Sequence, residues 1–166
     1  MEHMESDADS IEDNRLSDLP AAHSDAPAGA KTCPSRPCEP GSDVLGVMMP
    51  SGQLAYMLPP TPVDVEFVTT ELRRGHPEGR FRFSGPCVED RCPQWTGSRC
   101  AVGDIVVEQH VPVTAPITKL PTCAIRSTCR WFHQSGRAAC MACPSVVADT
   151  GGTGTYRELV SRQLAP

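Results

Sequence analysis

Aromatic side chains are scarce in this sequence, at 5 % of 166 residues, whereas proline and glycine together fill 30 positions. A chain with so few large apolar side chains forms a thin core, and such chains often depend on disulfides or metals for stability. No run approaches the roughly 20 apolar residues that cross a bilayer, so we expect no membrane span. The first 30 residues lack the basic start and apolar core of a secretory signal. We therefore predict a cytoplasmic protein, in which structural disulfides are rare.

Charge is distributed unevenly along the chain. Residues 1–30 contain eight acids and one base, while the remainder carries a net charge of +2. A polar, acidic segment of this kind buries too little apolar surface to offset the entropy lost on ordering. We expect residues 1–42 to be a disordered leader with a Pro-rich coil around Cys33 and Cys38. A single domain over 43–148 and a linker with a short C-terminal helix over 149–166 would follow.

Short apolar runs predict a small antiparallel sheet over 43–85. The runs 44–49 and 54–58 flank a Pro-Ser-Gly turn and are typical of a hairpin. Apolar and polar residues alternate over 63–68 and again over 81–84, and each alternation predicts a strand with one buried face.

The remaining domain, 86–148, is expected to be helical and loop-rich. We predict a short helix over 100–111 and a second over 125–134, with Gly136 as its terminator. The fold class is thus α+β: a small antiparallel sheet followed by a cysteine-dense, metal-binding segment, with a disordered N-terminus.

Seven of the nine cysteines fall within 57 residues. They form two similar triplets, each reading Cys, Cys, aromatic residue, Gly, Cys, plus one additional cysteine at the end. Two copies of one cysteine pattern indicate a metal site. The predicted ligands are Cys87, Cys92, Cys100, Cys123, Cys129, Cys140 and Cys143.

The spacing of these cysteines favours iron–sulfur chemistry over zinc. Structural zinc is often bound through short Cys-x(2–4)-Cys pairs, and Cys140 and Cys143 form the only tight Cys-x-x-Cys pair here. Iron–sulfur clusters accept wider spacings. Cys140-Met-Ala-Cys143-Pro144 resembles the end of a bacterial ferredoxin binding run, over five residues only, so no ferredoxin fold is implied. We predict one or two [4Fe-4S] clusters, with zinc as the alternative cofactor.

Ligand counting leaves the number of clusters open. One cluster needs four thiolates and two need eight, one more than the triplets and the additional cysteine supply. The candidates for the eighth ligand are His133, Cys33 and Cys38. We nevertheless expect that replacing either Cys33 or Cys38 leaves the metal content unchanged. A cluster with three thiolates would expose an open iron, as in a cluster-dependent enzyme.

A set of arginines, Arg126, Arg130 and Arg137, gives the second triplet a positive face. It could dock an acidic redox or biosynthetic partner protein, or compensate the charge of an anionic cluster. Nucleic acid is disfavoured, because no basic stripe is interleaved with aromatics. We predict electron transfer, or an accessory role for a partner enzyme, in preference to catalysis by the chain itself. A zinc-stabilised interaction or regulatory module is the first alternative, and the cluster enzyme is the second.

Overall fold

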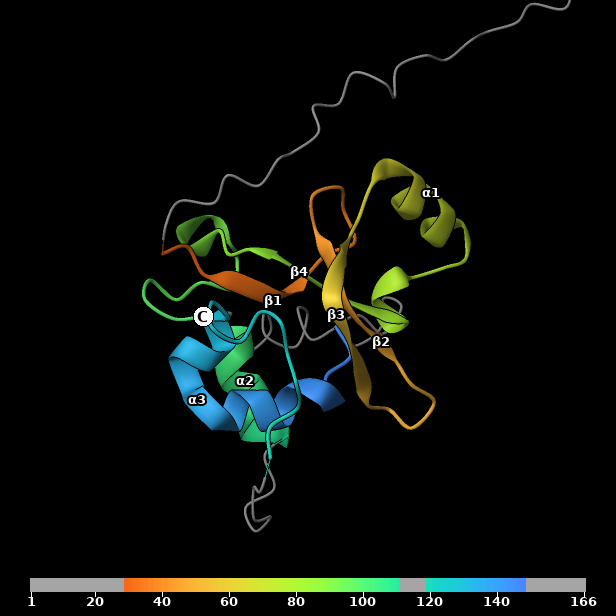
Figure 1. Ribbon diagram of the computed structural model, residues 1–166. Coiled ribbons are helices and arrows are strands. Elements are labelled where there is room, and N and C mark those ends of the chain that lie inside the picture. Colours follow the sequence, from red (N-terminus) through yellow and green to blue (C-terminus); the bar gives the residue numbers. More distant parts are fainter. Residues whose placement is uncertain (1–28, 111–118, 149–166) are drawn as a thin grey trace, which may run out of the picture.

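A computed structural model of the chain describes residues 29–110 and 119–148. The described part combines a four-stranded antiparallel sheet with three α-helices (Figure 1). This confirms the predicted α+β mixture and its small antiparallel sheet. The strands are β1 (Thr32–Arg36), β2 (Asp43–Met48), β3 (Leu54–Pro62) and β4 (Phe81–Pro86), and the helices are α1 (Val65–Arg73), α2 (Ala101–His110) and α3 (Arg130–Ala142). Single 3₁₀ turns occupy Pro77–Gly79, Glu89–Arg91 and Cys143–Ser145.

The predicted hairpin is present as β2 and β3, in a sheet of strand order β1-β4-β2-β3. Its turn is closed by hydrogen bonds from the Gly52 amide to the Met49 carbonyl and from the Met49 amide to the Gln53 carbonyl, both 2.9 Å. β3 lies at an edge of the sheet, where prolines cost no interstrand hydrogen bond on the open side. The prolines after residue 58 therefore continue the strand instead of ending it.

The strand predicted over 63–68 is wrong, because this segment begins α1. Asp64 is the N-cap, and its carboxylate accepts a hydrogen bond from the Phe67 amide at 2.8 Å. Val63 and Val68 flank the cap and belong to one apolar cluster, as in a hydrophobic staple. The cap chemistry outweighs the short alternation of apolar residues.

Two other boundaries differ from the sequence-based prediction. The Pro-rich segment containing Cys33, predicted as coil, forms β1 and pairs with β4. The helix predicted over 125–134 begins only at Arg130 and runs on to Ala142. Gly136, at φ +59°, is a kink within α3 instead of its end. The helix predicted over 100–111 is confirmed as α2, whereas residues 1–28, the connector 111–118 and the predicted C-terminal helix lie outside the described residues.

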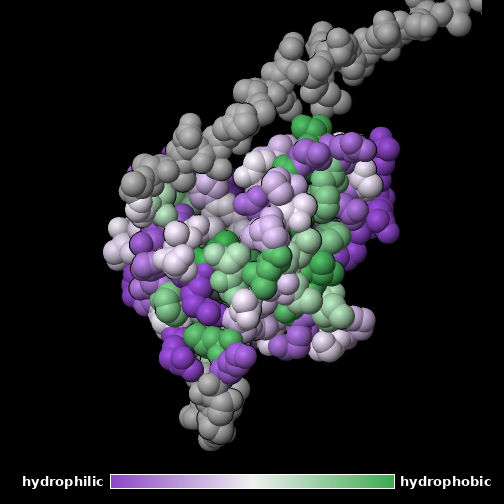
Figure 2. Space-filling view, in the orientation of Figure 1, coloured by the Kyte–Doolittle hydropathy of each residue, from purple (hydrophilic) through white to green (hydrophobic). Residues whose placement is uncertain are grey.

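The sheet lies between α1 on one face and the α2–α3 pair on the other (Figure 1). Adjacent strand residues point to opposite faces. Val44 and Phe83 therefore pack against Phe67 of α1, while Leu45 and Arg82 are directed towards α3. Apolar side chains gather across the middle of the visible face, and the α1 end is mostly hydrophilic (Figure 2).

The main apolar cluster forms where α2 and α3 meet. Trp131 is 1 % exposed and packs with Val106, Ala139 and Val146. The helices approach closely at Gly103, where a Cβ atom would lie 2.9 Å from Cδ1 of Trp131. Within the residues that the structure covers, no helix has the length and apolar character to cross a membrane.

Candidate metal centres

Eight of the nine cysteines gather in two groups of four, and all nine are free thiols. Each predicted triplet lines a cavity of its own, together with one further cysteine. We call Cys33, Cys87, Cys92 and Cys100 the first thiol site; they line a cavity of about 60 Å³. The second thiol site, around a cavity of about 20 Å³, consists of Cys123, Cys129, Cys140 and Cys143.

Backbone pairing brings the first thiol site together. Cys33 lies on β1 opposite Gly85 of β4, and the Cys87 amide donates to the Lys31 carbonyl at 2.8 Å. Cys92 and Cys100 flank a loop that closes on itself, since residues 95 and 100 form an isolated antiparallel bridge. A second cavity of about 90 Å³ adjoins the first and is lined by Cys33, Cys92 and Cys100. Three separate segments thus converge at this site.

The cysteines of the second thiol site lie near the start and near the end of α3, which is kinked at Gly136. Cys129 is the N-cap residue of α3, Cys140 lies in its last turns, and Cys143 begins the 3₁₀ turn that follows. Cys123 comes from the segment leading into α3. Tyr56 on β3 completes the wall of the cavity. Burial raises the pKa of Tyr56, and the charge of the neighbouring Cys143 thiolate raises it further.

Burial raises the pKa of two thiols at each site. The pKa reaches about 12 for Cys33 and for Cys129, chiefly through loss of solvation. Loss of solvation is also the main reason that the pKa values of Cys100 and Cys123 are raised. Thiols of the same site repel one another as thiolates and contribute to these shifts. A metal that binds here must displace the thiol protons. Its positive charge would then stabilise the thiolates, which burial has deprived of solvation by water.

Unpartnered polar groups face the first thiol site. Gln94 is 4 % exposed and lines both of its cavities, yet neither polar atom of its side chain has a hydrogen-bond partner. Two arginines also line the site, each with a buried Nε that lacks a partner. Arg36 pairs with Glu39, and Arg130 pairs with Glu89 and stacks on the Trp95 ring at 4.9 Å. Buried polar groups of this kind are normally satisfied, and here no other described side chain satisfies them.

The second thiol site has a cation beside it with no carboxylate partner among the described residues. Arg82 is 0 % exposed, and its Nη1 lies 3.9 Å from the Cys143 sulfur, while Nε and Nη2 have no partner. Arg126 lines the same cavity, donates to the Pro121 carbonyl and has an unpartnered Nε. A buried charge left unpaired costs several kcal/mol. An anionic occupant of the cavity would remove that cost.

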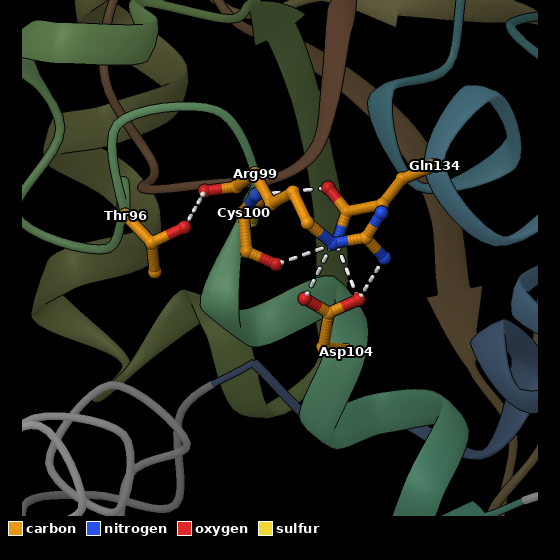
Figure 3. Close-up of polar contacts among 5 residues, drawn as sticks. All are labelled: Thr96, Arg99, Cys100, Asp104 and Gln134. Atoms are coloured by element: carbon orange, nitrogen blue, oxygen red, sulfur yellow. Dashed lines mark hydrogen bonds and ion pairs between the residues drawn. The ribbon is translucent and has the colours of Figure 1, made fainter.

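Gln134 of α3 fixes the backbone of one thiol-bearing residue. Its Oε1 accepts from the Cys100 amide at 2.8 Å, and its Nε2 donates to the Cys100 carbonyl at 2.8 Å and to Asp104 at 2.7 Å. Arg99 donates to both carboxylate oxygens of Asp104 and lowers the pKa of that carboxyl. Figure 3 shows the Gln134 amide between Cys100 and Asp104. The packing of α3 on α2 therefore orients the first thiol site.

Two of the candidate extra ligands lie away from the thiol sites. The Cys38 amide donates to Glu78 at 2.8 Å, and burial, followed by the charge of Glu78, raises the pKa of its thiol to about 11. His133 is exposed, with Nε2 at 2.8 Å from the Ser127 carbonyl and 3.4 Å from the Lys31 amine. Of the three candidates for an eighth ligand, only Cys33 joins a thiol site.

The predicted partner-binding arginines separate into two groups. Arg126 and Arg130 are half-buried against the thiol cavities, which favours charge compensation, and Arg137 is on the surface. Sequence reasoning missed Arg82 and Gln94. Arg82 alternates with Phe81 and Phe83, a pattern typical of a solvent-facing position, and no sequence signal marks it as buried.

Among the described residues, no three His, Cys, Asp or Glu side chains converge closely enough to hold a single metal ion. The thiols of each site stand around a cavity instead of meeting at a point. The chain matches no protein-family model, no curated protein and no solved structure.

Proposed function

We propose that this chain is a small iron–sulfur protein that binds two [4Fe-4S] clusters and serves in electron transfer, or as an accessory to a partner enzyme. Its support is the division of eight thiols into two groups of four, each around its own cavity. Four thiolates are the usual ligand set of one such cluster. Cys33 is the eighth ligand in this proposal, which replaces the expectation that its loss leaves the metal content unchanged.

The charges around the cavities support a cluster as the occupant. A [4Fe-4S] cluster with four thiolate ligands is an anion, and each site has two arginines beside it. They are Arg36 and Arg130 at the first site, and Arg126 and Arg82 at the second. Arg82, fully buried beside Cys143 without a carboxylate partner, gains a counter-charge when the second thiol site is filled. At the first thiol site, the unpartnered amide of Gln94 gains the sulfur atoms of the cluster as hydrogen-bond acceptors.

The same geometry weighs against the two alternatives. Zn–S bonds of about 2.3 Å bring four thiolates within about 4 Å of one another. The iron and sulfide atoms of a cluster keep its ligands further apart, in keeping with described thiols that do not converge on one point. An enzyme with an open iron needs a cluster short of one thiolate, and four thiols at each site provide a ligand for every iron. Electron transfer is the chemistry that fully ligated clusters support.

A matched pair of cysteine variants tests the proposal. The full chain, purified without oxygen, should be brown and contain about eight iron and eight sulfide per molecule, as two clusters require. Cys33→Ala should retain about half of that iron, since one site loses a ligand. Cys38→Ala is the control, because Cys38 sits only five residues away but lies against Glu78, outside both sites.

Three results would count against the proposal. A colourless wild-type protein with stoichiometric zinc would establish the zinc-stabilised module instead. Unchanged iron in Cys33→Ala would remove Cys33 from the ligand set. Equal iron loss in both variants would show that the effect is on folding and not on ligation.

A further inference from the structure

The two thiol sites lie back to back across a single strand. Neighbouring residues of a strand point to opposite sides, and β1 uses this alternation to line both cavities. Cys33 belongs to the first thiol site. Pro34, the next residue, is buried and lines the second. The wall between the sites is therefore one strand thick at this position.

A hydrogen bond connects the ligand-bearing segments of the two sites. The Thr32 amide donates to the Thr128 carbonyl at 2.8 Å, and the two threonine hydroxyls are also 2.8 Å apart. Thr32 also forms an isolated parallel bridge with Cys129. Cys33 of the first site and Cys129 of the second are thus each one residue away from the same hydrogen bond.

Trp131 forms another part of the shared wall. Its side chain is 1 % exposed and lines the second thiol site as well as the cavity that adjoins the first. Trp131 and Cys100 of the first thiol site line that adjoining cavity together. One aromatic ring thus touches the surroundings of both sites.

We propose that the two clusters act as one electron-transfer unit, with electrons passing between them across the wall formed by β1 and Trp131. The inference rests on the proposed function, since it needs both sites to hold clusters. Electron tunnelling weakens steeply with distance, and a wall one strand or one ring thick keeps the distance short. A one-electron donor protein reduces one cluster. That cluster is reoxidised as it reduces the other, and no bond or proton changes place.

Magnetic interaction between the reduced clusters tests this directly. The full chain, reduced with dithionite so that both clusters carry an electron, should give an EPR spectrum with additional splitting and faster spin relaxation. Cys33→Ala, which keeps only the second cluster, should give a simple, slowly relaxing spectrum. Cys87→Ala provides the same comparison if Cys33→Ala fails to fold, and Cys140→Ala isolates the first cluster.

The outcomes separate this inference from the proposed function. A wild-type protein with about eight irons whose spectrum equals the sum of the two single-site spectra would overturn the electron-transfer unit while leaving the iron–sulfur assignment intact. A protein without iron would overturn the proposed function, and this inference with it. Splitting that disappears in the single-site variants is the result we expect.

Discussion

Replacing Arg82 by methionine should lower the reduction potential of a cluster at the second thiol site. The guanidinium is fully buried, with Nη1 3.9 Å from the Cys143 sulfur, so its charge acts on the cluster with little screening. The electron added on reduction is spread over the iron atoms beyond that sulfur. At about 7 Å and an effective dielectric constant of about 20, a unit charge stabilises it by roughly 2 kcal/mol. For a one-electron couple this corresponds to a drop of about 100 mV when the charge is removed.

In the metal-free protein, the same substitution should leave the free energy of unfolding unchanged or raise it. Replacing a buried ion by an apolar group of similar volume is often neutral or stabilising, by about 1–4 kcal/mol. We therefore expect metal-free Arg82→Met to resist urea at least as well as the wild type, under anaerobic reducing conditions. Methionine is unbranched and adaptable, which makes it a suitable replacement for the alkyl part of the arginine.

The assay is a potentiometric titration of the full chain followed by EPR, with urea unfolding of the metal-free form in parallel. Arg82→Lys is the control, because it keeps the charge while changing the shape of the donor. A potential that falls in Arg82→Met and is largely retained in Arg82→Lys supports the electrostatic role. If the potential were unchanged in Arg82→Met while the metal-free protein lost several kcal/mol of stability, Arg82 would be a packing residue and the reasoning would be refuted.

Three other substitutions probe the surroundings of the sites. Tyr56→Phe removes the hydroxyl that lies beside Cys143 and can donate to its thiolate, worth about 1.5 kcal/mol for a charged acceptor. It should lower the potential of the second cluster by roughly 60 mV at unchanged iron content, and an unchanged potential would remove Tyr56 from this role. Gln134→Ala loses three hydrogen bonds, worth about 1 kcal/mol each. A chelator should then remove the iron faster, measured as the loss of the visible absorbance of the clusters. A wild-type rate would contradict the positioning role of Gln134. Gly103→Ala places a Cβ 2.9 Å from Trp131 Cδ1 and should destabilise the fold by about 1–3 kcal/mol, measured by thermal unfolding. An unchanged midpoint of the unfolding transition would show that the indole moves aside without cost.

Local patterns predicted the parts of the fold that depend on neighbouring residues. The β2–β3 hairpin follows from its turn, β4 from the Phe81 and Phe83 alternation, and α2 from its apolar spacing. The alternation at 63–68 was misleading, because three apolar positions fit a strand and also the start of a capped helix. Asp64, with its carboxylate on the Phe67 amide, was the signal that favours the helix.

Each triplet of the sequence repeat lines a separate cavity, a division that ligand counting from the sequence had left open. The repeat could not separate Cys33 from Cys38, which are symmetric members of one Cys-Pro-Ser-Arg-Pro-Cys segment. Their difference comes from pairing between distant segments, which places Cys33 opposite Gly85 and the Cys38 amide on Glu78. The buried Arg82 was likewise inaccessible to sequence reasoning, because its environment is set by α3.

Native mass spectrometry of the full chain, purified and sprayed without oxygen, gives the identity and the number of bound groups in one mass. We expect a chain carrying two [4Fe-4S] clusters, with a single-cluster species in Cys33→Ala. A wild-type mass that corresponds to bound zinc, or to the chain alone, would contradict this expectation.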